Sequence, residues 1–385
     1  MAERIKVLEV LEATVGGTRR HLVSLVDGLN KERFAVEVAA PFVRNSTIDD
    51  KSFVEEIEAL QVPLHYVDMC REIRPMSDIK ALYTLTNLIR KRQYHIVHLH
   101  SSKAGFVGRF AAKLNGVPTV YTPNGFYFLD ASSHSKQKIY LSLEQLAGLL
   151  TDKLIAVSNS EREVAIKNRI VPKDRVAMIP NAIDPDQFRP QPAIGQQVRL
   201  DLGIAPQTAV VGIVARYIPQ KDPLNVIRTA RLILNELPET VFVWCGEGEM
   251  RQAAETLACE LGVYDSFRFL GFRTDVKDIM RSFDLLLLSS LFEGLPYVLL
   301  EAMSLCLPIV ATDVVGSRDV IANGETGMLV PPRNPRQLAQ AVLTLLQTPD
   351  LRLDMGRRSQ RLVHSQYNTA KMVIDVETIY LSLTR

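Results

Sequence analysis

Two glutamates in the second half of the chain, Glu293 and Glu301, are separated by seven residues and lie between two contrasting segments. The run 284–289 before them contains four consecutive leucines, which is typical of a strand buried on both faces. A glycine and a proline follow Glu293, and residues 297–303 then have a helical pattern. We therefore expect Glu293 in a strand-to-helix turn and Glu301 two helical turns further on.

Such a turn has a defined chemistry in a doubly wound α/β domain. It faces the ligand crevice, and free N–H groups at the start of its helix attract phosphate. A carboxylate beside a phosphate is costly unless it binds something else, and sugar hydroxyls are suitable donors to an ionised carboxylate. Either glutamate alone is better explained as a solvated surface residue. The spacing, the preceding strand and the Phe-Glu-Gly-Leu-Pro turn together favour a binding site.

A pair of cations stands where a second strand runs into a helix. Arg216 and Lys221 follow the apolar run 210–215 and precede Pro223. Arginine binds in a planar fork and lysine acts as a point charge, so the two together suit a diphosphate. Taken singly, each is more often an ordinary solvated residue.

The N-terminal strand leads into a loop with paired glycines, Gly16 and Gly17, followed by a helix for which we expect Thr18 to be the cap. Glycines let a backbone approach a ligand closely, although a plain tight turn explains them equally well. The segment lacks the Gly-Lys-Ser/Thr ending of a P-loop. A Rossmann dinucleotide fingerprint is also missing from 245–251, where Arg251 replaces the third glycine. Both observations disfavour NAD-dependent chemistry.

The chain of 385 residues alternates apolar runs with amphipathic stretches, the pattern of parallel sheets covered by helices. We expect two Rossmann-like doubly wound α/β domains facing a central ligand cleft: residues 1–190 and residues 191–365, followed by a C-terminal helix, 366–385, that crosses back to the first domain. The proline-rich stretch 184–195 is interpreted as a linker. The expected strands are 5–10, 36–40, 96–99, 120–121, 154–157, 176–179, 210–215, 241–245, 267–270, 285–288 and 309–311.

Composition narrows the class of protein. Apolar residues make up 47% and charged residues 23%, and the net charge of +2 argues against nucleic acid as a partner. The four cysteines have no metal-ligand spacing, and His98 and His100, which share one face of a strand, are more often packed or hydrogen-bonded than metal ligands. We expect no metal. The N-terminus lacks a signal-peptide pattern, which favours a cytoplasmic protein.

These features converge on a family. The chain resembles the retaining GT-B glycosyltransferases of family 4 over nearly its whole length. Glu293 and Glu301 are similar to the E-x7-E signature, Arg216 and Lys221 to the diphosphate-binding pair, and Gly16 with Gly17 to the N-terminal glycine loop. Smaller similarities lie in 179–184, 271–273 and 324–332.

The resemblance implies roles for these residues. Glu293 would bind the donor sugar and stabilise charge at its anomeric carbon, and Glu301 would bind the ribose of the nucleotide. Because members of the family commonly use uridine nucleotides, the resemblance favours UDP as the nucleotide of the donor. Retention of anomeric configuration without a metal cofactor is implied, with the leaving diphosphate helping to take the acceptor's proton. The diphosphate and base contacts would come from Arg216, Lys221, Gly294, Leu295, Phe272 and Arg273.

One position departs from the family pattern. Many relatives carry a histidine in a loop of the first domain, and here that loop reads Tyr121-Thr-Pro-Asn124-Gly125. Asn124 can hydrogen-bond a sugar hydroxyl but cannot become charged near neutral pH. We expect Asn124 to be a contact to the donor sugar. If catalysis in the relatives needs an imidazole, this chain either does without it or uses His98 or His100.

The acceptor side is less determined. Ser101 follows a strand and opens a helix, so an anion can bind there. Relatives with a similar stretch act on lipid-linked glycans of bacterial surface polysaccharide, which implies a hexosyl- or N-acetylhexosaminyltransferase at the inner face of the cytoplasmic membrane. A membrane contact and a solvated face explain the basic residues Lys80, Arg90, Lys91, Arg92, Lys136 and Lys138 equally well. The acceptor candidates are Arg19, Arg20, His100, Ser101 and Lys103.

Two other functions fit the same architecture. A nucleotide-sugar 2-epimerase would change the identity of a sugar without an acceptor, but the E-x7-E pair with Arg216 and Lys221 fits transfer better. A catalytically silent regulatory homologue is supported only by Asn124, and the other retained residues argue against it.

Overall fold

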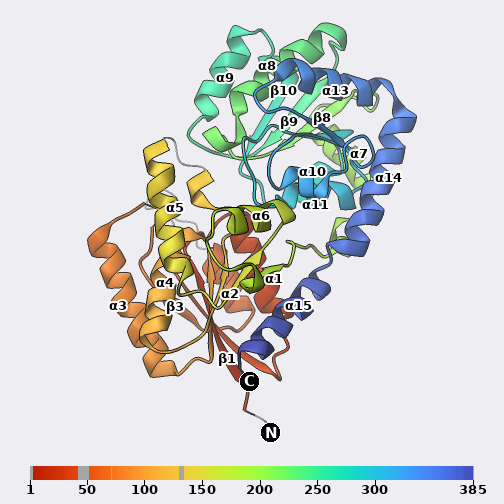
Figure 1. The fold of residues 1–385 in the computed structure, drawn as a ribbon. Helices are drawn as coiled ribbons and strands as arrows, with labels where there is room; N and C mark the ends of the chain where they lie inside the picture. Colours follow the sequence, from red (N-terminus) through yellow and green to blue (C-terminus); the bar gives the residue numbers. More distant parts are fainter. Residues whose placement is uncertain (1–2, 42–51, 71, 130–133, 385) are drawn as a thin grey trace. The chain divides into compact units, whose positions relative to one another are not determined.

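The computed structural model describes residues 3–41, 52–70, 72–129 and 134–384 (Figure 1). The described chain forms two compact units. The first contains residues 1–182 and 369–385, and the second contains residues 183–368. Along the described part of the chain, no helix combines the length and apolar character needed to span a membrane.

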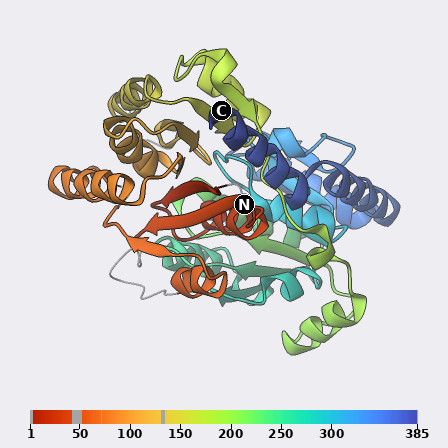
Figure 2. The same ribbon diagram turned by 90° about the horizontal axis from the view of Figure 1, so that it is seen from below.

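The first unit is built on a seven-stranded parallel sheet with the order β3-β2-β1-β4-β5-β6-β7. Helices α3, α4 and α6 cover one face, and α1, α2 and α15 cover the other (Figures 1 and 2). The strands are β1 (Ile5–Leu11), β2 (Phe34–Ala40), β3 (Leu64–Tyr66), β4 (Ile96–His100), β5 (Thr119–Thr122), β6 (Lys153–Ala156) and β7 (Val176–Met178). The helices are α1 (Gly17–Gly28), α2 (Ser52–Ala59), α3 (Pro75–Arg92), α4 (Ser102–Leu114), α5 (His134–Gly148), α6 (Asn159–Lys167) and α15 (Thr369–Leu383).

The C-terminal helix α15 is part of the first unit. Its buried residues Met372, Val373 and Val376 join a core cluster with residues of β1, α1 and β4. Gly28 marks a close approach to α1, because a Cβ there would lie 2.6 Å from a methyl group of Val373. The last segment of the chain therefore closes the hydrophobic core of the N-terminal sheet.

The second unit is a six-stranded parallel sheet with the order β10-β9-β8-β11-β12-β13. Its strands are β8 (Val210–Val214), β9 (Val241–Cys245), β10 (Phe267–Gly271), β11 (Leu285–Leu288), β12 (Ile309–Thr312) and β13 (Met328–Val330). Its α-helices are α7 (Pro192–Asp201), α8 (Pro223–Glu236), α9 (Arg251–Glu260), α10 (Val276–Met280), α11 (Tyr297–Ser304), α12 (Ser317–Val320), α13 (Pro335–Gln347) and α14 (Pro349–Gln366).

The two parallel-sheet α/β units confirm the expected fold class. Each expected strand is present, but the sequence analysis missed β3 and β13. Both are three-residue strands at a sheet edge, and β3 is only partly buried, so neither carries the long apolar run that marks a central strand.

The sequence analysis interpreted the stretch 184–195 as a linker, but part of it is helical. A 3-10 helix spans Pro185–Phe188, and α7 begins at Pro192. Proline is favoured in the first turn of a helix, so here it starts an element and does not break one. The contact-based division of the units lies between Ala182 and Ile183, and again between Asn368 and Thr369, whereas the sequence analysis placed it near residues 190 and 365.

Candidate active site

Glu293 lies in the turn between β11 and α11, as expected, and its side chain is 8% exposed. Its carboxylate forms an ion pair with the Lys221 ammonium group. The same oxygen, Oε1, accepts a hydrogen bond of 2.5 Å from the Ser290 hydroxyl. The carboxylate is therefore oriented and partly neutralised by groups from two loops, which limits its repulsion of a nearby phosphate.

The two loops that meet at Glu293 are also joined to each other by hydrogen bonds that backbone carbonyls accept. The Leu291 amide donates to the Gln220 carbonyl at 2.8 Å, and the Gln220 side-chain amide donates to the Phe292 carbonyl at 3.0 Å. The Ser289 hydroxyl donates to the Lys221 carbonyl at 2.6 Å. The loop after β8 and the loop after β11 thus behave as one support for the Lys221–Glu293 pair.

A third loop supports Glu293 from the side of β12. Gly316 has φ +85°, and a Cβ on it would lie 2.3 Å from the Gly294 carbonyl oxygen and 3.1 Å from the Glu293 carbonyl carbon. Only glycine fits that approach without moving the turn. The sequence analysis did not single out Gly316, because its importance depends on what lies opposite it.

Arg216 is exposed on the loop directly after β8, as expected for a residue at the carboxyl end of a strand. The next residue, Tyr217, is buried and stacks on Trp244 with ring centroids 4.2 Å apart. Gly246 and Gly248 lie against this loop, and Cβ atoms there would meet the Ala215 and Tyr217 carbonyl oxygens. The glycines after β9 therefore shape the loop that carries Arg216 and are not a dinucleotide fingerprint.

Glu301 lies on α11 and is 7% exposed. Gly294 and Leu295 precede the helix, which begins after Pro296. On the loop after β10, Phe272 is 72% exposed and Arg273 forms two hydrogen bonds with Asp275, of 2.8 and 2.6 Å. An exposed aromatic ring beside a fixed guanidinium group can stack on a planar base.

In the first unit, the glycine loop follows β1 as expected. Gly16 is the N-cap of α1 with φ +78°, and Gly17 is the first helical residue. The prediction that Thr18 caps the helix is wrong, because the helix begins one residue before it and no side chain caps its N-terminus. The positive φ of Gly16 already ends the extended chain, so a side-chain cap is not needed to turn it.

Asn124 lies two residues beyond β5 with φ +53°, a conformation that asparagine tolerates better than most residues. Its loop is fixed by Glu161, which accepts hydrogen bonds of 2.7 Å from the Gly125 and Val157 amides. Ser158 caps α6 by accepting from the Glu161 amide at 3.0 Å.

The acceptor candidates have unequal surroundings. Arg19 binds Glu56 and Ser52, each at 2.8 Å, and thereby ties α1 to α2. Lys103 is buried and donates two hydrogen bonds of 2.7 Å to Asp78 on α3. Both cations already have carboxylate partners, which reduces their value for an incoming anion. Arg20 is partly buried on α1, and Ser101 and His100 lie at the end of β4.

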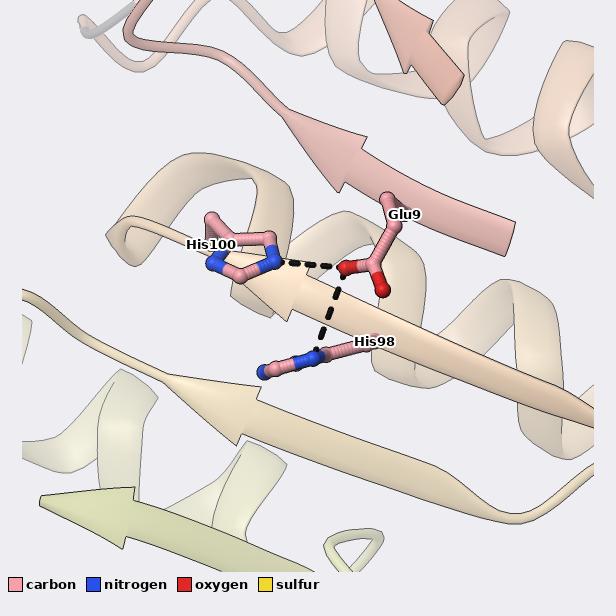
Figure 3. A group of neighbouring side chains, drawn as sticks. All are labelled: Glu9, His98 and His100. Atoms are coloured by element: carbon pink, nitrogen blue, oxygen red, sulfur yellow. Dashed lines mark hydrogen bonds and ion pairs between the residues drawn. The ribbon is translucent and has the colours of Figure 1, made fainter. Parts of the chain in front are cut away.

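A buried network at β1 and β4 was not foreseen as a unit. Figure 3 shows Glu9 between His98 and His100, with all three side chains inaccessible to solvent. Glu9 Oε2 lies 2.7 Å from His100 Nε2, and Glu9 Oε1 accepts a 2.6 Å hydrogen bond from the Tyr380 hydroxyl. The Tyr380 oxygen is 2.6 Å from His98 Nδ1, and His98 Nε2 is 2.8 Å from the Thr122 hydroxyl.

The hydrogen bonds from Thr122 through His98 and Tyr380 to Glu9 each have a donor and an acceptor if the His98 imidazole is neutral. Thr122 donates to His98 Nε2, His98 Nδ1–H donates to Tyr380, and Tyr380 donates to Glu9. Burial and the neighbouring His100 hold the pKa of His98 well below its usual value, which agrees with that arrangement.

The same three residues have the composition of a metal site, because their ligand atoms lie within 4.8 Å of one another. The hydrogen bonds account for both ring nitrogens of His98 and both oxygens of Glu9 without an ion. The prediction that these histidines are hydrogen-bonded is confirmed. The expectation that the protein needs no metal stays a prediction.

Comparison with known proteins assigns the chain to a family. The family model described as "Glycosyltransferase Family 4" matches residues 15–187, and "Glycosyl transferases group 1" matches residues 196–362. The UDP-Gal:alpha-D-GlcNAc-diphosphoundecaprenol alpha-1,3-galactosyltransferase of Escherichia coli is 31% identical over 86% of this chain and 85% of its own length. The chain belongs to glycosyltransferase family 4.

A second relative and a solved structure extend the comparison. The Staphylococcus aureus capsular polysaccharide biosynthesis glycosyltransferase CapM is 22% identical over 82% of this chain and 84% of its own length. Anabaena HepE, solved in complex with UDP-glucose, superimposes with a TM-score of 0.85 over 98% of this chain and 100% of its own, at 20% identity. That likeness confirms the GT-B fold of the glycosyltransferase.

Proposed function

We propose that this glycosyltransferase moves a sugar from a UDP-sugar to a lipid-linked glycan in bacterial surface polysaccharide synthesis, with retention and without a metal. The observation that carries the proposal is the Lys221–Glu293 pair in the β11–α11 turn, with Glu301 on the helix that follows. This geometry brings a neutralised carboxylate, a cation and backbone N–H groups to the same carboxyl edge of a parallel sheet.

The proposed chemistry follows from these groups. Arg216, Lys221 and the N–H groups of Gly294 and Leu295 hold the diphosphate and stabilise negative charge on it as the sugar leaves. Glu293 accepts hydrogen bonds from the sugar and stabilises positive charge at the anomeric carbon. The leaving phosphate takes the acceptor's proton, so no separate protein base is required. Asn124 contacts the donor sugar, and Glu301 accepts from the ribose hydroxyls.

Three similar proteins support the choice of substrates. The E. coli relative is described as using UDP-Gal and a diphosphoundecaprenol acceptor, and HepE was solved with UDP-glucose. The S. aureus relative is described as a capsular polysaccharide biosynthesis enzyme. A 2-epimerase would need no acceptor, so an acceptor-dependent product would separate the two functions.

Thermal unfolding with UDP, GDP, ADP and their sugars, with and without EDTA, tests the proposed function. A ligand at a hundred times its dissociation constant adds about 2.7 kcal/mol of stability. We expect a rise in melting temperature with the uridine series that EDTA does not change. A rise that EDTA removes would contradict metal independence, and no rise with any nucleotide would favour a silent homologue.

A membrane contact is proposed for the outer face of α3. Met76, Ile79 and Tyr83 are exposed there by 82%, 63% and 70%, and their spacing puts them on one side of the helix. Lys80 and Arg90 fall on the same side, so an apolar stripe and positive charge face solvent together. That combination suits the interface of an anionic lipid surface.

Sedimentation with vesicles tests this contact. We expect the protein to bind vesicles that contain anionic phosphatidylglycerol, and a variant with Met76, Ile79 and Tyr83 replaced by serine to lose most of that binding. Leu114, which is 66% exposed at the end of α4, supplies the control position, Leu114→Ser. Equal binding of both variants and wild type would argue against α3 as the contact.

A further inference from the structure

The end of β1 and the end of β4 form the switch point of the N-terminal sheet. In the order β3-β2-β1-β4-β5-β6-β7, strands β2 and β3 are added on one side of β1, and strands β4 to β7 are added on its other side. Ligands of open parallel sheets bind outside the carboxyl ends of the strands at this point. Leu11 pairs with His100, so Glu12 and Ser101 emerge side by side from the two strands.

Three buried polar atoms at this switch point have no hydrogen-bond partner among the described residues. They are Glu12 Oε1, His21 Nε2 and His100 Nδ1. Glu12 is 3% exposed, and both histidines are fully buried. A buried polar group without a partner is costly, and such groups are rare in folded proteins.

The contact with Glu9 determines whether His100 Nδ1 donates or accepts hydrogen bonds. An ionised carboxylate can only accept, so His100 Nε2 carries the proton in its 2.7 Å contact with Glu9 Oε2. In the neutral tautomer that this contact selects, His100 Nδ1 is a lone pair that accepts hydrogen bonds.

The same reasoning applies to His21. Its Nδ1 lies 2.9 Å from Asn181 Oδ1, which is an acceptor, so Nδ1 carries the proton and Nε2 is a lone pair. Burial and the nearby His100 lower the pKa of His21 to about 3, which keeps the ring neutral at physiological pH. All three unpartnered atoms are therefore acceptors.

The three acceptors belong to one small region. The His21 and His100 ring centroids are 5.4 Å apart, and the Ser101 hydroxyl, one residue beyond His100, donates to Glu12 Oε2 at 3.1 Å. The Ser101 proton is used within the protein, so the unpartnered side-chain atoms here are all acceptors. An anion would meet a carboxylate and two lone pairs there.

We propose that Glu12, His21 and His100 form a subsite that accepts hydrogen bonds from the hydroxyl groups of the acceptor's sugar and excludes phosphate. This inference rests on the proposed transfer to a glycan acceptor. The sugar of the acceptor then binds at the β1–β4 switch point, and the diphosphate of a lipid-linked acceptor binds outside this subsite.

Saturation-transfer NMR with methyl glycosides of N-acetylglucosamine, glucose and galactose tests the subsite in the full-length protein saturated with UDP. We expect at least one glycoside to bind wild type and to bind at least about tenfold more weakly to Glu12→Gln, since the amide replaces an acceptor by a donor. His21→Phe, which keeps a ring but removes the lone pair, is expected to weaken binding as well. Glu37→Gln makes the same chemical change on β2, away from the switch point, and should bind as wild type does.

Other outcomes overturn the subsite. They are failure of all three glycosides to bind wild type, equal binding by Glu12→Gln and wild type, and displacement of a bound glycoside by inorganic phosphate. Equal binding would mean that water alone satisfies these atoms. Melting curves of each variant detect loss of folding, and His21→Phe keeps the test decisive if Glu12→Gln does not fold. UDP binding and UDP-sugar hydrolysis are measured separately, so failure of the proposed donor chemistry is distinguished from failure of the subsite.

Discussion

The Glu293→Gln variant is expected to lose at least about 10²-fold in kcat while its dissociation constant for UDP stays nearly unchanged. The glutamine keeps the size of the side chain but removes the negative charge that stabilises the developing positive charge on the sugar. Lys221 loses its ion-pair partner and stays available to the diphosphate, so nucleotide binding does not suffer. Stopped assays of UDP release and calorimetric titration with UDP measure the two quantities.

Glu301→Gln supplies the complementary variant. Because Glu301 is proposed to accept from the ribose, its loss should weaken UDP binding by about tenfold and change kcat little. Glu325→Gln, on an exposed turn of the same unit, is the control and should match wild type in both. If Glu293→Gln weakened UDP binding and left kcat intact, the two glutamates would have exchanged roles. If neither variant differed from wild type, the site would lie elsewhere.

The parts of the site that follow a strand were predictable from sequence. Glu293, Glu301 and Arg216 each stand a fixed distance beyond an apolar run, and parallel strands bring such positions to one edge of a sheet. The helix after Glu293 begins at Tyr297 as expected, because a glycine and a proline before it mark the turn.

The parts that depend on partners far along the chain were not predictable. Tyr380 and Glu9 are separated by 371 residues and meet through a 2.6 Å hydrogen bond. Nothing local to Glu9 distinguishes it from a charged residue on an edge strand. The only signal was its position in a strand expected to be buried on both faces, where a carboxylate needs a partner.

Residue-type rules for helix starts also failed where one residue type can occupy more than one position around a helix start. Pro192 was interpreted as a linker residue and instead opens α7. Thr18 was interpreted as a cap, although Gly16 with φ +78° already ends the extended chain. In both cases the residue type is compatible with a helix start, but the residue type alone does not determine at which position the helix begins.

Gly316→Ala is expected to lower kcat severely, by an amount approaching that of Glu293→Gln. Its new Cβ would lie 2.3 Å from the Gly294 carbonyl oxygen, a contact that real side chains do not make. The turn that carries Glu293 must then shift, and a displacement of about 1 Å at a reacting group can cost about 10²-fold in rate. The Ser290 and Lys221 contacts to Glu293 would be disturbed together.

Gly324→Ala separates this effect from backbone strain. Gly324 has φ +81°, close to the +85° of Gly316, but a Cβ there has no atom within 4 Å among those described. Both variants carry the strain of an alanine at positive φ, so both should lose stability in denaturant unfolding. Only Gly316→Ala should lose most of its kcat at a temperature where both are folded. Similar rates for the two variants would mean that the Glu293 turn tolerates displacement, and the electrostatic role given to a fixed Glu293 would then have to be abandoned.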